Sequence, residues 1–312
     1  MIRLKASAVQ LTAIAVAMYL GAAQTAGCGE SKAGEYDLIQ SWGGKGEGEG
    51  KFKSACSIAM DKEGNLFIAD PEAKLIHKYS SDGKFLTKWP TAQSPRAVAV
   101  DDEGTVYVAE TGDKGVIEKF ASEGKAGKPG TIGKGQPAGI AVSEKFIYVS
   151  DTSTGTVQRF TKDGKAAGKW GKLSTCCGRL DIKVDKQDNV YVAELGKHRV
   201  AKFDGEGKLI AAWGKSGTGR GEFCGCCNPI SLFLAQDGTI FTVEDTQPRV
   251  QKFTEDGKWL GEFGAGVFSN ECMYMGIAVS PDGKVYIIDD GTCTVKVFGQ
   301  KGKTDESDAK GK

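Results

Sequence analysis

Six times along the chain, the alternation of hydrophobic and polar residues predicts the same series of short β-strands. Each copy has an apolar strand, a turn, a strand that contains an aromatic residue and ends in a carboxylate, and a third strand that closes on another aromatic residue. Turns such as Glu103-Gly104 follow the first strand, because this pair suits the positive φ angles of a tight hairpin. The first strands are expected at 57–60, 97–100, 139–142, 181–184, 231–234 and 276–279.

The spacing of these copies predicts the fold class. The aromatic residues of the second strands are 40, 41, 43, 50 and 45 residues apart: Phe67, Tyr107, Tyr148, Tyr191, Phe241 and Tyr286. A period of about 40 to 50 residues with four short strands is typical of a β-propeller blade, which buries its faces only when neighbouring blades stack around an axis. We therefore predict one all-β, six-bladed propeller of four-stranded blades rather than two domains.

The last copy lacks a fourth strand, and the segment 36–43 has that pattern ahead of the first copy. Placing 36–43 beside the third strand of blade six would close the ring and remove two open sheet edges. Elsewhere the fourth strand ends on an aromatic residue, except at Ile132-Gly133, and these aromatic side chains are expected to pack between blades. The propeller is thus predicted over 36–298, followed by a charged, disordered tail at 299–312.

The first residues predict export. Arg3 and Lys5 precede an apolar stretch from Ala6 to Ala23, and small residues lead to Cys28, which is typical of a secretory signal rather than a membrane anchor. The segment resembles a bacterial lipoprotein signal, although Thr25 stands where that family usually has Leu. The resemblance implies a signal peptide at 1–27, a lipid on Cys28 and a tether at 28–35, in the cell envelope on a membrane surface or in the periplasm. The alternative is ordinary cleavage near Ala26 and secretion.

Three motifs in the copies resemble NHL repeats. They are Pro137–Val142, Gly104–Glu110 and Arg249–Phe253, and the resemblance covers roughly 36–298. It implies a six-bladed propeller, and such propellers include ligand scaffolds and a few enzymes.

The cysteines are expected on one face of the ring. The loop that leads into the first strand of a blade, here called the leading loop, shares a face with the loop between the second and third strands, here called the 2–3 loop. If Cys28 carries lipid, eight cysteines remain, an even number that suits disulfides in an exported chain. All eight fall in these loops of blades four, five, six and one: Cys56, Cys176, Cys177, Cys224, Cys226, Cys227, Cys272 and Cys293. We call this side of the ring the cysteine face.

Two interpretations of these cysteines stay open. They form disulfides that brace the leading loops, with vicinal pairs bonded to other partners because adjacent residues are too close for an unstrained bridge. Alternatively, they form a thiolate site for a soft metal or a redox-active disulfide. No cofactor is expected beyond such a soft metal, and no metal ligand is assigned.

A second set of residues recurs in every blade at the end of the second strand. These carboxylates are predicted to accept backbone N–H groups of the leading loops, rather than to bind a divalent cation. They are Asp70, Glu110, Asp151, Glu194, Glu244 and Asp289.

Charge and histidine content narrow the function. With 41 basic and 40 acidic side chains, the chain lacks the excess positive charge of a nucleic-acid binder. The two histidines, His77 and His198, fall beside the third strands of opposite blades, so they are predicted to be solvated surface residues that share no ligand. Propeller lactonases and lyases typically hold a metal with His, Asn and Glu ligands. Because the two histidines here fall in opposite blades, such an enzyme is the least favoured interpretation.

We therefore predict a non-enzymatic binding or scaffold propeller that presents the cysteine face to a protein, a glycan or a small ligand. The alternative is a thiol-based protein for metal handling or electron transfer. Contact residues are expected where the blades differ, because ring construction does not require them. These are Arg96, Arg179, Met273, Tyr274, Met275 and the loop 214–227.

Overall fold

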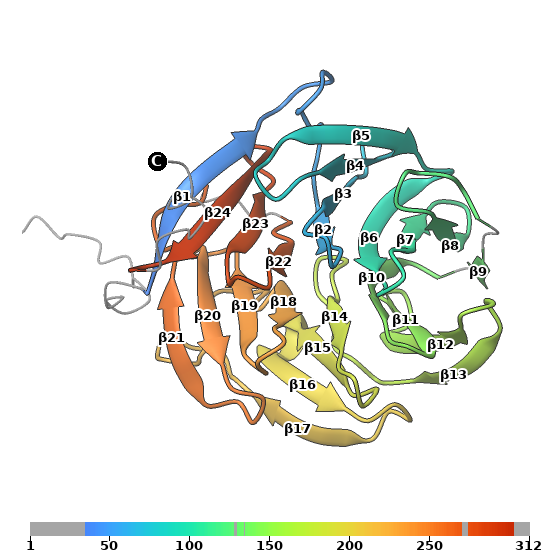
Figure 1. The fold of residues 1–312 in the computed structure, drawn as a ribbon. Helices are drawn as coiled ribbons and strands as arrows, with labels where there is room; N and C mark the ends of the chain where they lie inside the picture. The colour runs from blue at the N-terminus through green and yellow to red at the C-terminus, as the bar shows by residue number, and fades with distance from the viewer. Residues whose placement is uncertain (1–34, 128–129, 134, 270–273, 303–312) are drawn as a thin grey trace, which may run out of the picture.

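The computed structural model describes residues 35–127, 130–133, 135–269 and 274–302. In these ranges, 24 strands form six four-stranded antiparallel sheets arranged around a central axis (Figure 1). The predicted all-β, six-bladed propeller is therefore confirmed. The predicted signal peptide, Cys28 and most of the predicted tether, as well as Cys272, Met273 and most of the predicted tail, lie outside the described residues.

Each blade is built from consecutive strands, counted from the axis outward. The innermost strands are β2 (Ser57–Met60), β6 (Ser94–Val100), β10 (Pro137–Val142), β14 (Ile182–Val184), β18 (Ser231–Leu234) and β22 (Ile277–Val279). The second strands are β3 (Leu66–Asp70), β7 (Val106–Thr111), β11 (Phe146–Asp151), β15 (Val190–Glu194), β19 (Ile240–Glu244) and β23 (Val285–Asp289). The third strands are β4 (Leu75–Tyr79), β8 (Gly115–Phe120), β12 (Thr156–Thr161), β16 (Arg199–Phe203), β20 (Arg249–Phe253) and β24 (Thr294–Gln300). The outermost strands are β5 (Phe85–Pro90), β9 (Gly130–Gly133), β13 (Ala166–Trp170), β17 (Leu209–Trp213), β21 (Trp259–Phe263) and β1 (Tyr36–Gly43).

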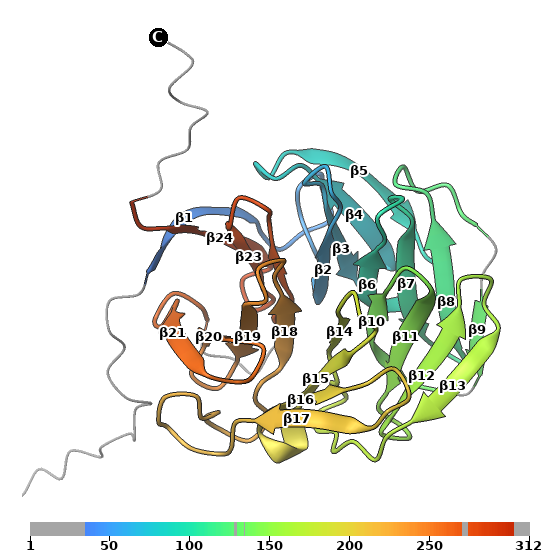
Figure 2. The ribbon, with the colours of Figure 1, turned by 60° about the horizontal axis from the view of Figure 1, so that its bottom comes forward.

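The N-terminal strand closes the ring, as predicted. β1 pairs antiparallel with β24, from Tyr36 opposite Gln300 to Gly43 opposite Thr294, and a bulge interrupts the register between Leu38 and Gln40. Figure 2 shows the two strands side by side at the rim of blade six. β24 reaches Gln300, so the last strand extends two residues past the predicted end of the propeller at 298.

Burial explains why these segments form strands in this order. The second strands are sandwiched between neighbouring blades, and β3, β15, β19 and β23 are buried along their whole length. The outermost strands are more exposed, and in β5 exposed residues alternate with covered ones along the strand. Alternation with a period of two is what a strand with one solvated side requires.

Aromatic side chains join neighbouring blades, in agreement with their predicted role. The aromatic residue at the end of an outermost strand packs on the third-strand aromatic residue of the next blade. The ring-centroid distances are 4.6 Å for Trp42–Tyr79, 5.9 Å for Trp89–Phe120, 4.8 Å for Trp170–Phe203, 6.5 Å for Trp213–Phe253 and 5.2 Å for Phe263–Phe298. Blade six takes part through β1, because Trp42 of that strand contacts blade one.

A glycine in the hairpin of the next blade makes room for each tryptophan at the end of an outermost strand. Gly207 has a φ of +86°, and a Cβ placed there would lie 2.3 Å from Cγ of Trp170. Gly83, Gly124 and Gly257 stand in the same relation to Trp42, Trp89 and Trp213. The repeated glycine therefore serves both the left-handed turn and the packing between blades.

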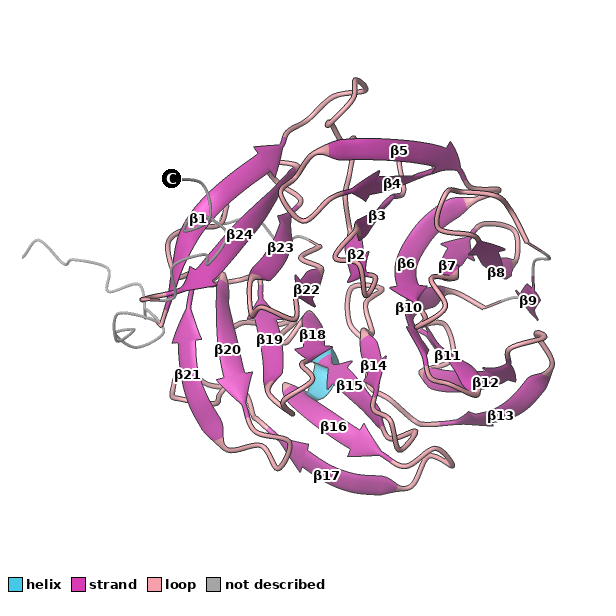
Figure 3. Cartoon of the chain, in the orientation of Figure 1, coloured by secondary structure: helices cyan, strands magenta, loops and turns pink. Residues whose placement is uncertain are grey.

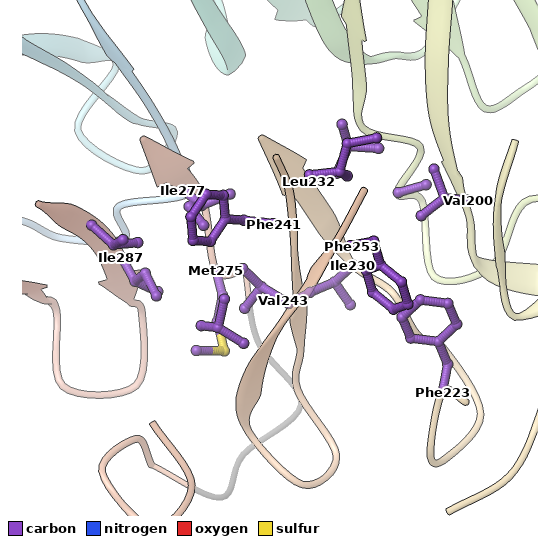
Figure 4. Close-up of a cluster of buried hydrophobic side chains, with 14 of the residues drawn as sticks. Val200, Phe223, Ile230, Leu232, Phe241, Val243, Phe253, Met275, Ile277 and Ile287 are labelled. Carbon is purple, nitrogen blue, oxygen red and sulfur yellow. The ribbon is translucent and has the colours of Figure 1, made fainter. Parts of the chain in front are cut away.

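The largest buried cluster spans blades four to six (Figure 4). Met275, just before β22, lies between Val243 of β19 and Ile287 of β23, and Phe223 of the loop 214–227 packs against Phe253 of β20. Phe223 is fully buried, so part of the loop predicted as a contact surface belongs to the core.

Among the residues that the structure describes, helical structure is confined to one turn. The 3-10 helix η1 (Leu195–Lys197) lies in the 2–3 loop of blade four (Figure 3). None of the helical segments in the described part of the chain has the length and hydropathy of a membrane span.

Candidate functional site

The recurring carboxylates at the ends of the second strands are all buried, at 0 or 1% exposure. Each accepts a hydrogen bond from a backbone N–H of the leading loop of its own blade. The donors are Lys53 and Ser54 for Asp70, Gln93 for Glu110, Gln136 for Asp151, Ser174 for Glu194, Cys224 for Glu244 and Ser269 for Asp289. Because six blades repeat this contact, it fixes the leading loops rather than forming one binding site.

The third strand supplies a further partner to this carboxylate, and this partner differs between blades. Arg249 Nε lies 2.6 Å from Glu244 in blade five, and Lys296 Nζ lies 3.3 Å from Asp289 in blade six. In blade two the neighbour is another carboxylate, Glu118. Burial, followed by the adjacent Glu118 carboxyl, raises the pKa of Glu110 to about 8.

The prediction for His77 is wrong. Its side chain is 2% exposed and lies in β4 next to the rings of Phe52 and Tyr79, with Nε2 3.6 Å from Asp70. His77 occupies the position on the third strand that faces the buried carboxylate, which is why it is not on the surface. His198 is half-buried, and its Nε2 lies 2.9 Å from the carbonyl oxygen of Gly225. Neither histidine lines the mouth of the central channel.

Residues that differ between blades meet at the mouth of the channel on the cysteine face. Arg96 comes from blade two, Arg179 from the leading loop of blade four and Tyr274 from that of blade six. The guanidinium carbons lie 4.8 Å (Arg96) and 4.5 Å (Arg179) from the centre of the Tyr274 ring. Arg96 also donates a hydrogen bond to the Tyr274 hydroxyl. Met275, from the same predicted set, lines this mouth too.

The positive charges of the mouth are balanced unequally. Arg179 donates to Asp245 at 2.8 Å, and Lys183 lies 2.8 Å from Asp181. Within the described ranges, no carboxylate forms an ion pair with Arg96. Burial raises the pKa of Asp290, in the 2–3 loop of blade six, to about 6. The Arg96 guanidinium is therefore the cation of this mouth that is available to an external anion.

The mouth leads to an apolar channel. A cavity of about 40 Å³ lies among Arg96, Arg179 and Tyr274. A second cavity of about 140 Å³ lies along the innermost strands, among Ile58, Val98, Ile140, Phe233 and Ile277. Ile58, Lys183 and Ile277 line both cavities, so they are neighbours along the axis.

Four of the cysteines come together beside the mouth. The Cys227 sulfur lies 2.9 Å from that of Cys176, 3.0 Å from that of Cys177 and 3.2 Å from that of Cys226. We call Cys176, Cys177, Cys226 and Cys227 the thiol cluster. Cys224 belongs to the same leading loop as Cys226 and Cys227. Among the residues that the structure describes, seven cysteines are present and all are unbridged.

Two further cysteines lie apart from the thiol cluster. Cys56 lines the channel mouth, with its thiol 3.4 Å from the carbonyl oxygen of Arg96, and burial raises its pKa to about 12. Cys293 is buried against the leading loop of blade one, 3.5 Å from the carbonyl oxygen of Lys53. Both thiols are therefore buried beneath the cysteine face rather than exposed on it.

Sequence reasoning missed Asp245 and Asn228, both fully buried. Asp245 accepts from Arg179 through Oδ2 and donates its backbone N–H to Asn228 Oδ1 at 2.9 Å. A signal for Asp245 exists in the sequence, because blades five and six have a second acid directly after the recurring carboxylate, as Glu244-Asp245 and Asp289-Asp290. Asn228 gives no such signal, because its role depends on loop geometry.

The sequence matches no protein-family model and no curated protein. Among solved structures, the chain is similar to a protein of unknown function from Bacteroides thetaiotaomicron, with 17% identity, a TM-score of 0.68, and coverage of 85% of this chain and 75% of that chain. It is also similar to streptogramin B lyase, with 13% identity, a TM-score of 0.62, and coverage of 85% and 98%. Virginiamycin B lyase from Staphylococcus aureus matches with 15% identity, a TM-score of 0.59, and coverage of 84% and 99%. At these identities the similarity shows the six-bladed fold alone, and the NHL resemblance stays a prediction.

Proposed function

We propose that this chain is a non-enzymatic binding propeller that takes a small organic anion at the channel mouth on the cysteine face. The observation that supports the proposal is the convergence of Arg96, Arg179 and Tyr274 from three alternate blades onto the axis. Ring construction does not require these side chains, because the other blades have Pro or Ala at the position of Arg179 and Tyr274, and uncharged residues at the position of Arg96.

The chemistry of the mouth favours an anion. Guanidinium groups bind carboxylates and phosphates with two parallel hydrogen bonds. Asp245 already balances Arg179, whereas among the described residues the side-chain hydrogen-bond partner of Arg96 is the neutral Tyr274 hydroxyl. The apolar channel beneath the mouth favours a ligand with a hydrocarbon portion, since burial contributes about 0.8 kcal/mol per CH₂ group. A carboxylate with a short aliphatic chain fits both the guanidinium at the mouth and the apolar channel beneath it.

The lyases that share the fold give a weaker alternative. Streptogramin B lyase and virginiamycin B lyase are enzymes by name, but a shared propeller fold does not carry an activity. His77 is buried in blade one and His198 lies in the 2–3 loop of blade four, so neither supplies an imidazole to the channel mouth. A binding function is the better-supported conclusion.

Calorimetric titration of the full chain tests the proposal, with acetate, hexanoate and inorganic phosphate as probes. We expect hexanoate to bind more tightly than acetate, and Arg96→Ala to weaken hexanoate about 10- to 100-fold, as for a lost charged hydrogen bond. Arg220→Ala is the matched control, because Arg220 stacks on Trp259 away from the mouth. Equal binding by the Arg96 variant, or no binding of any probe, would overturn the proposal and leave a protein or glycan partner for this face.

We also propose that the chain is exported and carries a lipid on Cys28, on the basis of its leader sequence alone. Mass spectrometry of the purified N-terminal peptide should detect a diacylglycerol adduct on Cys28, and Cys28→Ser should lack it. An unmodified peptide that begins near Gly27 would instead indicate a secreted protein.

A further inference from the structure

Three sulfur atoms of the thiol cluster form a compact triangle. The Sγ atoms of Cys176, Cys177 and Cys227 are 2.9, 3.0 and 3.4 Å apart, and no pair stands out as a bonded couple. Cys227 is fully buried, Cys176 is half-buried and Cys177 is exposed. The triangle therefore has a buried base and a side that solvent can reach.

The backbone at Cys177 turns two adjacent thiols toward the same point. Arg179 N–H donates to the Cys176 carbonyl at 3.1 Å, and both central residues of this turn have positive φ, +53° at Cys177 and +67° at Gly178. Two positive φ angles are typical of a type I′ turn. A non-glycine residue is disfavoured in this region, so the surrounding structure must hold Cys177 there.

One residue, Asp245, holds both loops that carry the triangle. Its carboxylate binds Arg179, which follows the turn of Cys176 and Cys177. Its backbone N–H donates to the side chain of Asn228, which directly follows Cys227. Asn228 also donates to the carbonyl of Cys224 at 2.5 Å, which fixes the other end of that loop. The three thiols are thus positioned by buried contacts rather than by one another.

The spacing suits a shared ion better than a single disulfide. A disulfide of about 2.05 Å would use two sulfurs and leave the third thiol unpaired in the triangle. In a tetrahedral thiolate site with metal–sulfur bonds of about 2.3 Å, sulfur atoms lie about 3.8 Å apart, so each pair would open by less than about 1 Å. Cysteine side chains reach this separation by small rotations, and all three sulfurs become ligands.

We propose that Cys176, Cys177 and Cys227 form a binding site for one soft d¹⁰ cation, Cu(I) or Zn(II). Thiolate ligands select these ions over hard cations. Binding replaces three S–H protons by three metal–sulfur bonds, and three protons go to solvent. The site is separate from the channel-mouth anion site and does not depend on that proposal.

The test uses the full chain, reduced and metal-free under anaerobic conditions. Cu(I) and Zn(II) are titrated separately against a competing chromophoric chelator. We expect one equivalent of at least one of the two ions to bind, and the relative affinities identify the ion. Cys227→Ser should weaken binding by more than the roughly 100-fold that loss of a supporting residue produces. Cys293→Ser, another buried thiol outside the cluster, is the matched control and should bind as the unaltered chain does.

Two further variants keep the proposal falsifiable if Cys227→Ser misfolds. Cys177→Ser changes an exposed sulfur and should lose binding while its circular dichroism and melting temperature stay unchanged. Asp245→Asn, a change at a positioning residue, should weaken binding about 10- to 100-fold. Unaltered binding in Cys177→Ser, or the absence of binding by either ion to the reduced chain, would overturn the proposal. A Cys227 disulfide in the unreduced protein together with no metal binding after reduction would assign the cluster to a structural bridge instead.

Discussion

Arg179 and Asp245 form a buried ion pair at 2.8 Å that ties blade four to blade five beside the channel mouth. The side chains are 8% and 0% exposed. The same arginine contacts the Tyr274 ring, and the same aspartate anchors the loop of Cys227 through Asn228. This pair therefore connects the candidate anion site with the thiol cluster.

Replacing Asp245 by Asn should destabilise the protein by about 3 kcal/mol, because it removes the negative charge from a buried pair and leaves the guanidinium positive. Urea unfolding monitored by tryptophan fluorescence measures the change. Asp113→Asn, at an exposed aspartate, should shift the free energy of unfolding by less than about 0.5 kcal/mol. Equal stability of the two variants would show that the ion pair contributes nothing.

The Glu110–Glu118 pair predicts a fall in stability between about pH 5 and pH 8. Folded Glu110 has a pKa of about 8, above its ordinary value near 4.5, so the folded state keeps a proton that the unfolded state has lost. The stabilisation that protonation provides is complete below the unfolded pKa and is lost as the pH rises through the folded pKa.

Glu118→Gln should flatten this pH dependence, because it removes the second carboxyl while burial of Glu110 remains. Urea midpoints at pH 5, 6, 7 and 8 compare the two proteins. Asp290, whose raised pKa acts in the same direction, is present in both and cancels in the comparison. Identical slopes would contradict the assignment of the proton to this pair.

Gly207→Ala tests the packing of Trp170 on the neighbouring hairpin. The new Cβ would overlap the indole ring, so we expect a loss of about 1–3 kcal/mol from overpacking in addition to the cost of positive φ. Gly104→Ala isolates the backbone cost, because Gly104 has a similar φ of +80° and no atom within 4 Å of its Cβ position. If both variants lose the same free energy of unfolding in chemical denaturation, the overlap with Trp170 does not contribute to the loss.

Deletion of 36–43 should abolish cooperative unfolding, because it removes β1 from blade six and exposes the edge of β24. Differential scanning calorimetry of the deleted chain is the measurement. Ile39→Ser, on the exposed side of the same strand, should unfold as the unaltered chain does. A sharp, unshifted transition in the deleted chain would refute the role of β1 as a closing strand.

The period of the sequence was sufficient to predict the fold. Strand alternation and the aromatic positions gave six blades, and the incomplete last copy located β1, because blade geometry follows from local pattern.

The sequence also placed Arg96, Arg179 and Tyr274 at positions that differ between blades, although their meeting at the axis requires the closed ring. Which sulfurs meet could not be predicted, because it depends on a turn at Cys177 and on a buried aspartate from another blade. The prediction that His77 is a surface residue was wrong because its side chain faces inward toward Asp70. Glu118 in blade two and Gln251 in blade five occupy the same position of the third strand.

The register of β1 also determines which face of the propeller a lipid anchor on Cys28 would hold toward a membrane. β24 begins at the cysteine face and ends at Gln300 on the opposite face, and Tyr36 pairs with Gln300. The chain therefore enters the propeller from the side away from the cysteines. Eight residues, 28–35, span at most about 28 Å when fully extended. A propeller held by a lipid on Cys28 would keep the face opposite the cysteine face toward the bilayer and direct the channel mouth and the thiol cluster outward.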